Sequence, residues 1–119
     1  MESLEELITN KKFDSYRVGL ESRFAANKLT FEFTYTGPEG GSALRARLEK
    51  KEKIAEVCVW ESGHLNLELG DTEKETEDIE SYYWKTTDSN GFHDALAAGF
   101  LFVTGKGDYK SSIQKIDKN

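Results

Sequence analysis

The side chains that most often perform catalysis are few in this sequence. It contains two histidines, His64 and His93, and one cysteine, Cys58. Neither histidine stands at a spacing from Asp, Glu or Cys that forms a recognised metal or nucleophile motif. Ser62 and His64 are two residues apart and would share a face of a strand, but no third group that would orient the imidazole is evident. We therefore predict a protein that is not an enzyme.

Two further patterns could bind phosphate or metal, and both have simpler interpretations. Lys106 lies between Gly105 and Gly107, as in a phosphate-binding loop. Such a loop follows a strand and opens a helix, whereas Lys106 follows a predicted helix, so these glycines indicate a helix cap. The acidic run 71–78 lacks EF-hand spacing and supports only weak, nonspecific attraction of calcium. We expect no cofactor and no bound metal.

Carboxylates are concentrated in one segment of the chain. Between residues 61 and 80 there are eight acids and one lysine, a local charge of −7 within a total of −6. The acids are Glu61, Glu68, Asp71, Glu73, Glu75, Glu77, Asp78 and Glu80. Such a field repels phosphate backbones and attracts cationic surfaces. The segment argues against nucleic-acid binding and is compatible with a basic protein partner, although a solvated hairpin edge has the same composition.

Length and composition limit the framework that carries these residues. The chain has 119 residues, of which 37% are hydrophobic, 12% aromatic and 32% charged. This length suits one domain with one core, and the aromatic content exceeds that of disordered segments. No apolar run approaches the roughly 18 residues of a membrane span, and acids occupy the N-terminus where a signal peptide is basic. We expect a single domain, 1–119, in the cytoplasm, with no membrane partner.

Residues 1–26 carry a helical pattern. Ser3 and Glu6 are placed as a capping box at its start. Apolar residues then recur at helical spacing, in the order Leu4, Leu7, Ile8, Phe13, Tyr16, Leu20 and Phe24. One bent helix or two short helices satisfy this pattern equally well.

Residues 29–86 change to the period of two that is typical of strands. Alternation predicts strands near 29–36, 44–49 and 65–69, and the apolar run 54–60 predicts a central strand with both faces covered. A fifth strand contains Ile79, Tyr82, Tyr83 and Trp84. Gly63 is expected to close a tight hairpin at a positive φ. The sequence predicts an α+β fold with an antiparallel sheet of about five strands.

The C-terminal third contains a second helical pattern and a polar tail. Apolar residues recur at helical spacing over 89–104, and Asp88, Ser89 and Asn90 can cap this helix. Gly105 is placed to end it in a left-handed cap. We expect the helix to pack on the sheet. The tail 106–119 has four lysines and few apolar residues, and we expect it to be disordered or weakly held.

The hairpin around residues 57–69 resembles a known family. Val59, Trp60, Glu61, Ser62 and Gly63 spell VWESG, the hairpin signature of the TriTu family of bacterial immunity proteins. In that family an N-terminal helix precedes a small antiparallel sheet, the strand after VWESG ends in Asp, and a closing helix contains an AL…F pattern. Asp71, Ala95, Leu96 and Phe100 are similar to the matching positions. The resemblance covers about residues 54–103.

The resemblance implies a protein made together with a polymorphic or contact-dependent toxin, whose C-terminal domain it binds. Blocking the active site or substrate access requires no catalysis, and a nuclease toxin would be basic enough to be attracted by the acidic segment. Trp60 is expected to anchor the core. The expected toxin-binding residues are Glu61, His64, Asn66, Glu68, Asp71, Glu73, Glu75, Glu77 and Asp78.

Two alternatives from other functional classes remain. The first is a domain that binds or converts a small ligand in a pocket between sheet and helices. Its lining would be aromatic, from Phe31, Phe33, Tyr35, Tyr82, Tyr83 and Trp84. The second is a scaffold or oligomerising subunit that pairs through an exposed strand edge.

Overall fold

A computed structural model describes residues 3–37, 41–71 and 79–117 of this chain. It contains four helices and five strands in these residues and confirms the α+β fold class. In chain order they are α1 (Leu4–Ile8), α2 (Asp14–Ala26), β1 (Thr30–Thr36), β2 (Ala43–Lys50), β3 (Lys53–Trp60), β4 (His64–Asp71), β5 (Glu80–Lys85), α3 (Asn90–Thr104) and α4 (Tyr109–Asp117).

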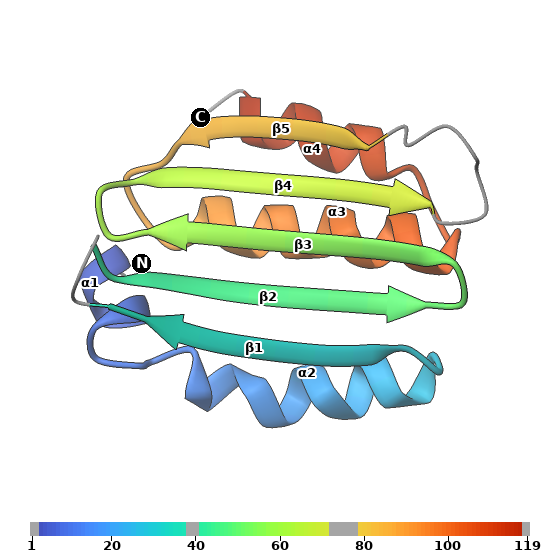
Figure 1. The fold of residues 1–119 in the computed structure, drawn as a ribbon, viewed down its shortest axis with the longest axis horizontal. Coiled ribbons are helices and arrows are strands. Elements are labelled where there is room, and N and C mark those ends of the chain that lie inside the picture. Colours follow the sequence, from blue (N-terminus) through green and yellow to red (C-terminus); the bar gives the residue numbers. More distant parts are fainter. Residues whose placement is uncertain (1–2, 38–40, 72–78, 118–119) are drawn as a thin grey trace.

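The five strands form one antiparallel sheet in the order in which they occur in the chain, β1-β2-β3-β4-β5. Figure 1 shows this meander, with β3 in the centre and β1 and β5 at the edges. The predicted hairpin between β3 and β4 is confirmed, with Gly63 at φ +101°. A Cβ at this glycine would lie 2.5 Å from the Thr86 carbonyl oxygen, so both conformation and space require glycine there.

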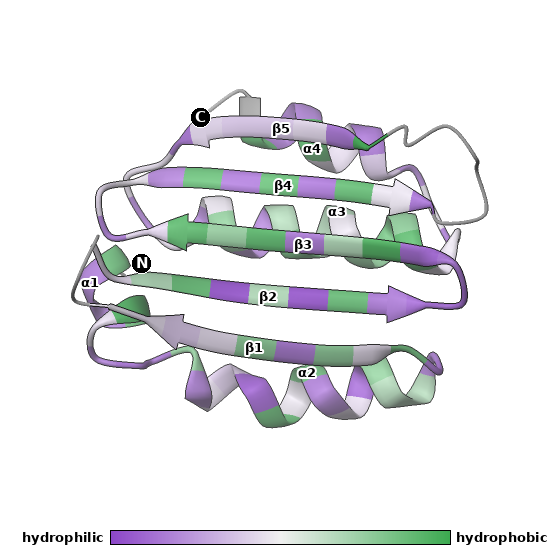
Figure 2. Ribbon diagram, viewed as in Figure 1, coloured by the Kyte–Doolittle hydropathy of each residue, from purple (hydrophilic) through white to green (hydrophobic). Residues whose placement is uncertain are grey.

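All described helices lie on the same face of the sheet (Figure 1). The strand residues that point toward them are fully buried along the three central strands, as with Leu48, Val57 and Leu67. Figure 2 shows the resulting alternation of hydrophilic and hydrophobic residues along β2 and β4. We call the opposite side of the sheet the open face. The prediction that β3 is covered on both faces is therefore wrong, because no described helix backs its second face.

The N-terminal helical pattern resolves into two helices, α1 and α2. Ser3 caps α1, since its hydroxyl accepts a hydrogen bond from the Glu6 amide at 3.2 Å. Phe13 lies between the helices, is fully buried, and has its ring 5.2 Å from that of Phe33 and 5.5 Å from that of Phe92. Phe13 therefore ties the N-terminal segment to both the sheet and α3. Tyr16, by contrast, is 38% exposed and does not belong to the core.

Helix α3 lies closest to the centre of the sheet. Gly99 faces β3 so closely that a Cβ there would lie 3.0 Å from the Cβ of Ala55. Ala95 and Ala98 are fully buried on the same helix, and these small residues let the helix approach the strands. The predicted left-handed cap is confirmed at Gly105, with φ +67° and its amide bonded to the Leu101 carbonyl at 2.9 Å.

The tail is a helix, so the prediction of a disordered or weakly held segment over 106–119 is wrong for the residues of α4. Ile113 and Ile116 are buried in the common core. The Tyr109 hydroxyl donates to Glu80 at 2.8 Å and thereby joins α4 to β5. The pKa of Tyr109 is raised to about 12, mainly by burial of the side chain and secondly by this bond to a carboxylate. The contacts of Tyr109, Ile113 and Ile116, which recur at helical spacing, hold this segment on the core despite its polar composition.

If α4 is part of the core, truncating Ile113 will destabilise the whole protein. We expect Ile113→Ala to lower the free energy of unfolding by about 2 to 4 kcal/mol, because the side chain is 5% exposed. Urea denaturation, monitored by tryptophan fluorescence, measures this change in the free energy of unfolding. Gln114→Ala, at an exposed position of the same helix, is the control and should change stability little. Equal stability of both variants would mean that α4 is not held by the core.

Candidate functional site on the open face of the sheet

The register of the strands determines which side chains share the open face. Arg45 pairs with Cys58, Cys58 with Asn66, and Asn66 with Tyr83, which gives one row across four strands. The adjacent row runs from Glu32 through Arg47, Glu56 and Glu68 to Ser81. Because side chains alternate between faces with a period of two, none of these residues faces the helices.

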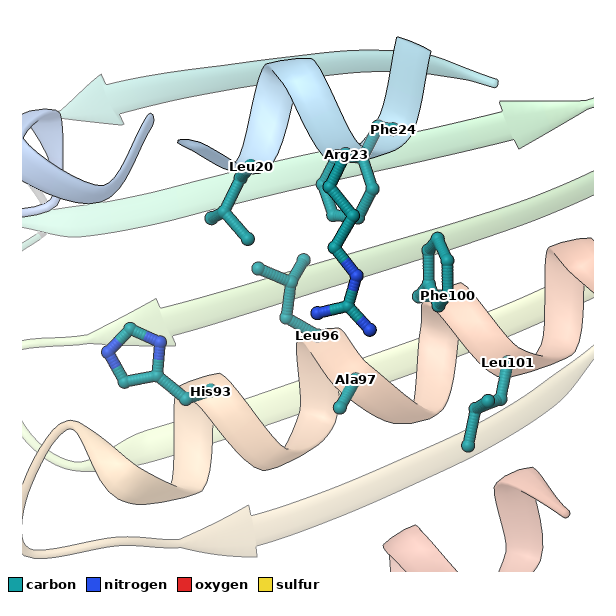
Figure 3. Close-up of a pocket in the computed structure, with 8 residues that line it drawn as sticks. All are labelled: Leu20, Arg23, Phe24, His93, Leu96, Ala97, Phe100 and Leu101. Atoms are coloured by element: carbon teal, nitrogen blue, oxygen red, sulfur yellow. The ribbon is translucent and has the colours of Figure 1, made fainter. Parts of the chain in front are cut away.

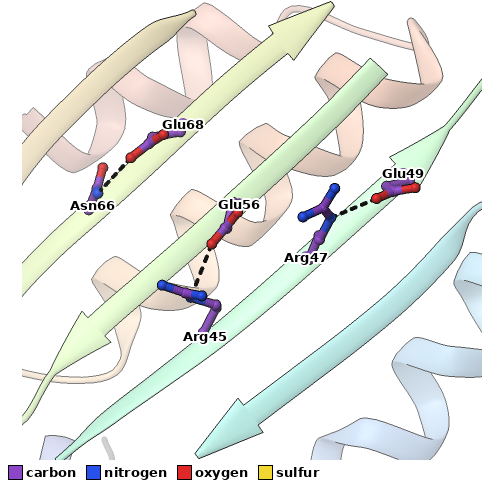
Figure 4. A network of polar contacts seen from close by, with 6 residues as sticks. All are labelled: Arg45, Arg47, Glu49, Glu56, Asn66 and Glu68. Carbon is purple, nitrogen blue, oxygen red and sulfur yellow. Dashed lines mark hydrogen bonds and ion pairs between the residues drawn. The ribbon is translucent and has the colours of Figure 1, made fainter. Parts of the chain in front are cut away.

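Three polar contacts lie on the central strands of this face, and one of them, between Arg45 and Glu56, joins two strands (Figure 4). The Arg45 guanidinium Nε lies 3.0 Å from the Glu56 carboxylate, and that of Arg47 lies 2.6 Å from Glu49. On β4 the Asn66 amide Nδ2 donates to Glu68 at 3.2 Å. The ion pairs are solvated, with Arg45 60% exposed, so each contributes only about 0.2 to 1 kcal/mol to stability.

The centre of this face contains two features that disfavour folding. Glu56 and Glu68 are direct cross-strand partners, and like charges at such positions repel. Arg45 offsets the charge of Glu56, but no cationic side chain of the described residues lies within 4.0 Å of the Glu68 carboxylate. The Asn66 Oδ1 is buried with no hydrogen-bond partner in the described part of the chain, which costs about 1 to 3 kcal/mol. Such local conflicts concentrate at functional sites.

Apolar and aromatic residues lie around this polar centre. Tyr83, opposite Asn66, is 71% exposed, and Ile79, the residue immediately before β5, is 55% exposed. Trp60 pairs with Ala43 on the open face and is half-buried, so its predicted role as a core anchor is wrong. Cys58 is 8% exposed beside Arg45, and burial raises the pKa of its thiol. Exposed tyrosine and arginine side chains are enriched at protein interfaces, so this mixture is compatible with one.

Only part of the predicted toxin-binding set lies together on this face. His64, Asn66 and Glu68 share the open face of β4, and Glu61 is exposed in the adjoining turn. Asp71 does not join them, because it pairs with Lys53 and lines a groove with Thr104 of α3 on the helix side. The remaining four residues, Glu73, Glu75, Glu77 and Asp78, lie outside the described residues.

Residues on the neighbouring strands were missed by sequence reasoning. Arg45, Glu56 and Tyr83 complete the face that β4 begins. The alternation in β2 indicates that Arg45 points away from the core, but its neighbours follow only from the strand register. Tyr83 had no such signal, because three aromatic residues in succession leave the orientation of β5 undetermined.

The Ser62 hydroxyl and the His64 Nδ1 are 2.9 Å apart, so the pair singled out by its spacing is indeed hydrogen-bonded. Both side chains are exposed, and within the described residues no carboxylate is paired with this imidazole. No group of three His, Cys, Asp or Glu residues in the same part of the chain could hold a metal ion. The geometry is that of a hydrogen-bonded turn.

The aromatic residues of the rival ligand pocket do not line a common cavity. Phe31 and Phe33 pack against Phe13, whereas Tyr83 lies on the other face of the sheet. A groove of about 330 Å³ does exist between α2 and α3, and Figure 3 shows its lining. The Arg23 guanidinium lies 4.8 Å from the centre of the Phe100 ring there. This groove contains none of the six aromatics that the alternative named.

Comparison with known protein families identifies a matching family model. A family model described as the immunity protein TriTu matches residues 11–99, from the segment before α2 into α3. No curated protein and no solved structure matches this chain. In the described part of the chain, no helix combines the length and apolar character needed to cross a bilayer.

The repulsion between Glu56 and Glu68 predicts a stabilising substitution. We expect Glu68→Gln to raise the free energy of unfolding by about 0.5 kcal/mol at neutral pH, since it removes the like charge and keeps an acceptor for Asn66. Urea denaturation at low salt measures this, and the gain should shrink in 0.5 M NaCl. Glu56→Gln is the matched control and should gain less, because it also removes the ion pair with Arg45. A loss of stability in Glu68→Gln would contradict this account.

Proposed function

The chain belongs to the TriTu family of immunity proteins, and from this premise we propose that it binds and neutralises a cognate bacterial toxin domain in the cytoplasm of the cell that makes it. The observation that carries the proposal is the family match over residues 11–99. The open face supports it, because a sheet face that no described helix covers offers a broad surface to a protein partner. Immunity proteins generally act by binding, without catalysis.

The proposed mechanism is stoichiometric occlusion. A domain of this kind covers the active site of the toxin or the path of its substrate, and the complex persists because many contacts are made at once. The proposed contacts are those on the open face, His64, Asn66 and Glu68, together with Glu61 and the acidic segment 71–78. Toxin residues that bind a charged substrate are then occupied by side chains of this protein.

We further propose that the toxin acts on nucleic acid. The support is electrostatic: residues 61–80 carry a local charge of −7, although the whole chain carries −6. A nuclease needs a cationic surface to hold phosphates, and a concentrated negative field accelerates association with such a surface. The same field competes with the substrate for that surface.

The immunity role predicts association and rescue with a specific partner. We expect the tagged protein, co-expressed with the C-terminal domain encoded by the gene immediately upstream, to co-purify with that domain at equal stoichiometry. Cells that express the domain alone should stop growing, and co-expression of this chain should restore growth. A matched toxin domain from an unrelated system serves as the control and should be neither bound nor neutralised. Absence of both binding and rescue would refute the immunity role for this pair.

Neutralising the acidic segment should change the rate of association with the toxin more than it changes the stability of the fold. In a variant with Glu73→Gln, Glu75→Gln and Glu77→Gln, we expect the association rate at low salt to fall about tenfold and its salt dependence to weaken. Stopped-flow mixing at several salt concentrations measures both. The control carries Glu5→Gln, Asp14→Asn and Glu21→Gln, which remove the same charge from the exposed sides of α1 and α2. Equal salt slopes for both variants would show that the segment does not steer the toxin.

A further inference from the structure

We propose that the toxin docks on the open face by seating one basic side chain, an arginine or a lysine, against Glu68 beside the ring of Tyr83. This inference rests on the proposed function, since it names the surface and the partner chemistry of that same interaction. It differs from the acidic-segment proposal because it places the strongest contacts on β4 and β5, within the described residues.

The charge of Glu68 identifies the chemistry of the partner group. Its carboxylate lies across from Glu56, and Arg45 is committed to Glu56 at 3.0 Å. Asn66 Nδ2 holds the Glu68 carboxylate at 3.2 Å while its own Oδ1 stays buried without a partner in the described part of the chain. The acceptor is therefore positioned, and no cationic side chain of residues 3–37, 41–71 and 79–117 pairs with it. A partner guanidinium or ammonium group would supply that cation and relieve the repulsion.

Tyr83 adds a second feature that favours a cation. It is opposite Asn66 on β5, hence diagonal to Glu68 on the same face, and is 71% exposed. Diagonal cross-strand neighbours are within reach of aromatic and long side chains. A basic side chain bound to Glu68 can thus lie along the ring, where cation–π attraction and burial of the ring both contribute. Tyr83 is the most exposed of the large hydrophobic residues described.

The open face is large enough to form most of a specific interface. Five strands at about 4.8 Å spacing are about 24 Å wide, and four rows of side chains extend about 20 Å along the strands. The projected area is therefore on the order of 500 Å². Each partner of a typical specific complex buries about 800 Å², so this face supplies more than half of that area.

The same charges disfavour some other occupants of this face. A second copy whose two-fold axis passes through Glu68 would bring the two Glu68 carboxylates together. An axis along β3 would instead set Glu68 against the arginines of β2 in the second copy, and sedimentation of the protein alone tests that arrangement. A nucleic acid would bring phosphates against Glu56 and Glu68. A protein with a protruding basic residue meets neither repulsion.

The test measures the affinity of the full-length protein for the purified upstream-encoded toxin domain by calorimetry. We expect Glu68→Gln and Tyr83→Ala each to weaken binding at least tenfold, while both variants stay folded and Glu68→Gln is no less stable than the parent. Tyr83→Phe should keep most of the affinity, because it keeps the ring. Glu21→Gln on α2 is the matched control and should bind as the parent does; its carboxylate is 51% exposed on a helix.

The outcomes separate this inference from the proposed function. If the parent protein binds the toxin domain and both Glu68→Gln and Tyr83→Ala bind equally well, the docking surface lies elsewhere and only this inference is overturned. If the parent protein does not bind at all, both proposals are refuted for this partner. Sedimentation of the protein alone gives an independent check, because self-association lost in Tyr83→Ala would assign the face to a second copy and overturn the inference.

Discussion

The packing of α3 against one face of the sheet is the interaction on which the rest of the structure depends. Gly99 and Ala55 bring the helix axis close to β3, and the fully buried leucines of β2 and β4 fill the space on either side. Phe92 and Phe100 then extend the contact to Phe13 and Phe24 of the N-terminal segment. A Cβ at residue 99 would require Ala55 or the helix to shift by a few tenths of an ångström, so this position limits how closely the two layers can pack.

In this arrangement the two faces of the sheet contribute differently to stability. The face toward α3 carries the burial of apolar area that stabilises the domain. The open face contributes less to stability, and its residues are free to be chosen for other properties. That freedom accounts for the direct opposition of Glu56 and Glu68 and for the buried Asn66 Oδ1, which a core position could not tolerate. It also accounts for the exposed Tyr83. A strand at this position could be formed equally well by a smaller residue such as threonine.

The sequence predicted the elements well where one physical signal dominated. Alternation in β1, β2 and β4, the positive φ at Gly63 and the cap at Gly105 all followed from local chemistry. Failures arose where tertiary packing decided the outcome. Trp60 was expected in the core, yet the strand parity that buries Val57 and Val59 turns it outward. Tyr109, Ile113 and Ile116 of α4 recur at helical spacing. The prediction of a disordered or weakly held tail gave more weight to the polar composition of the segment.

The candidate site was the least predictable part, because it is a property of register. Sequence reasoning identified β4 through His64, Asn66 and Glu68, which share one face of one strand. The partners of these residues come from β2, β3 and β5, and their positions depend on how far each hairpin shifts its strands. A shift of one residue in β5 would exchange Tyr83 for Trp84 on the open face and bury the tyrosine beneath it. The β3–β4 hairpin therefore also determines which side chains lie on the open face, since the Gly63 carbonyl accepts a hydrogen bond from the Thr86 amide at 2.7 Å and so aligns β5.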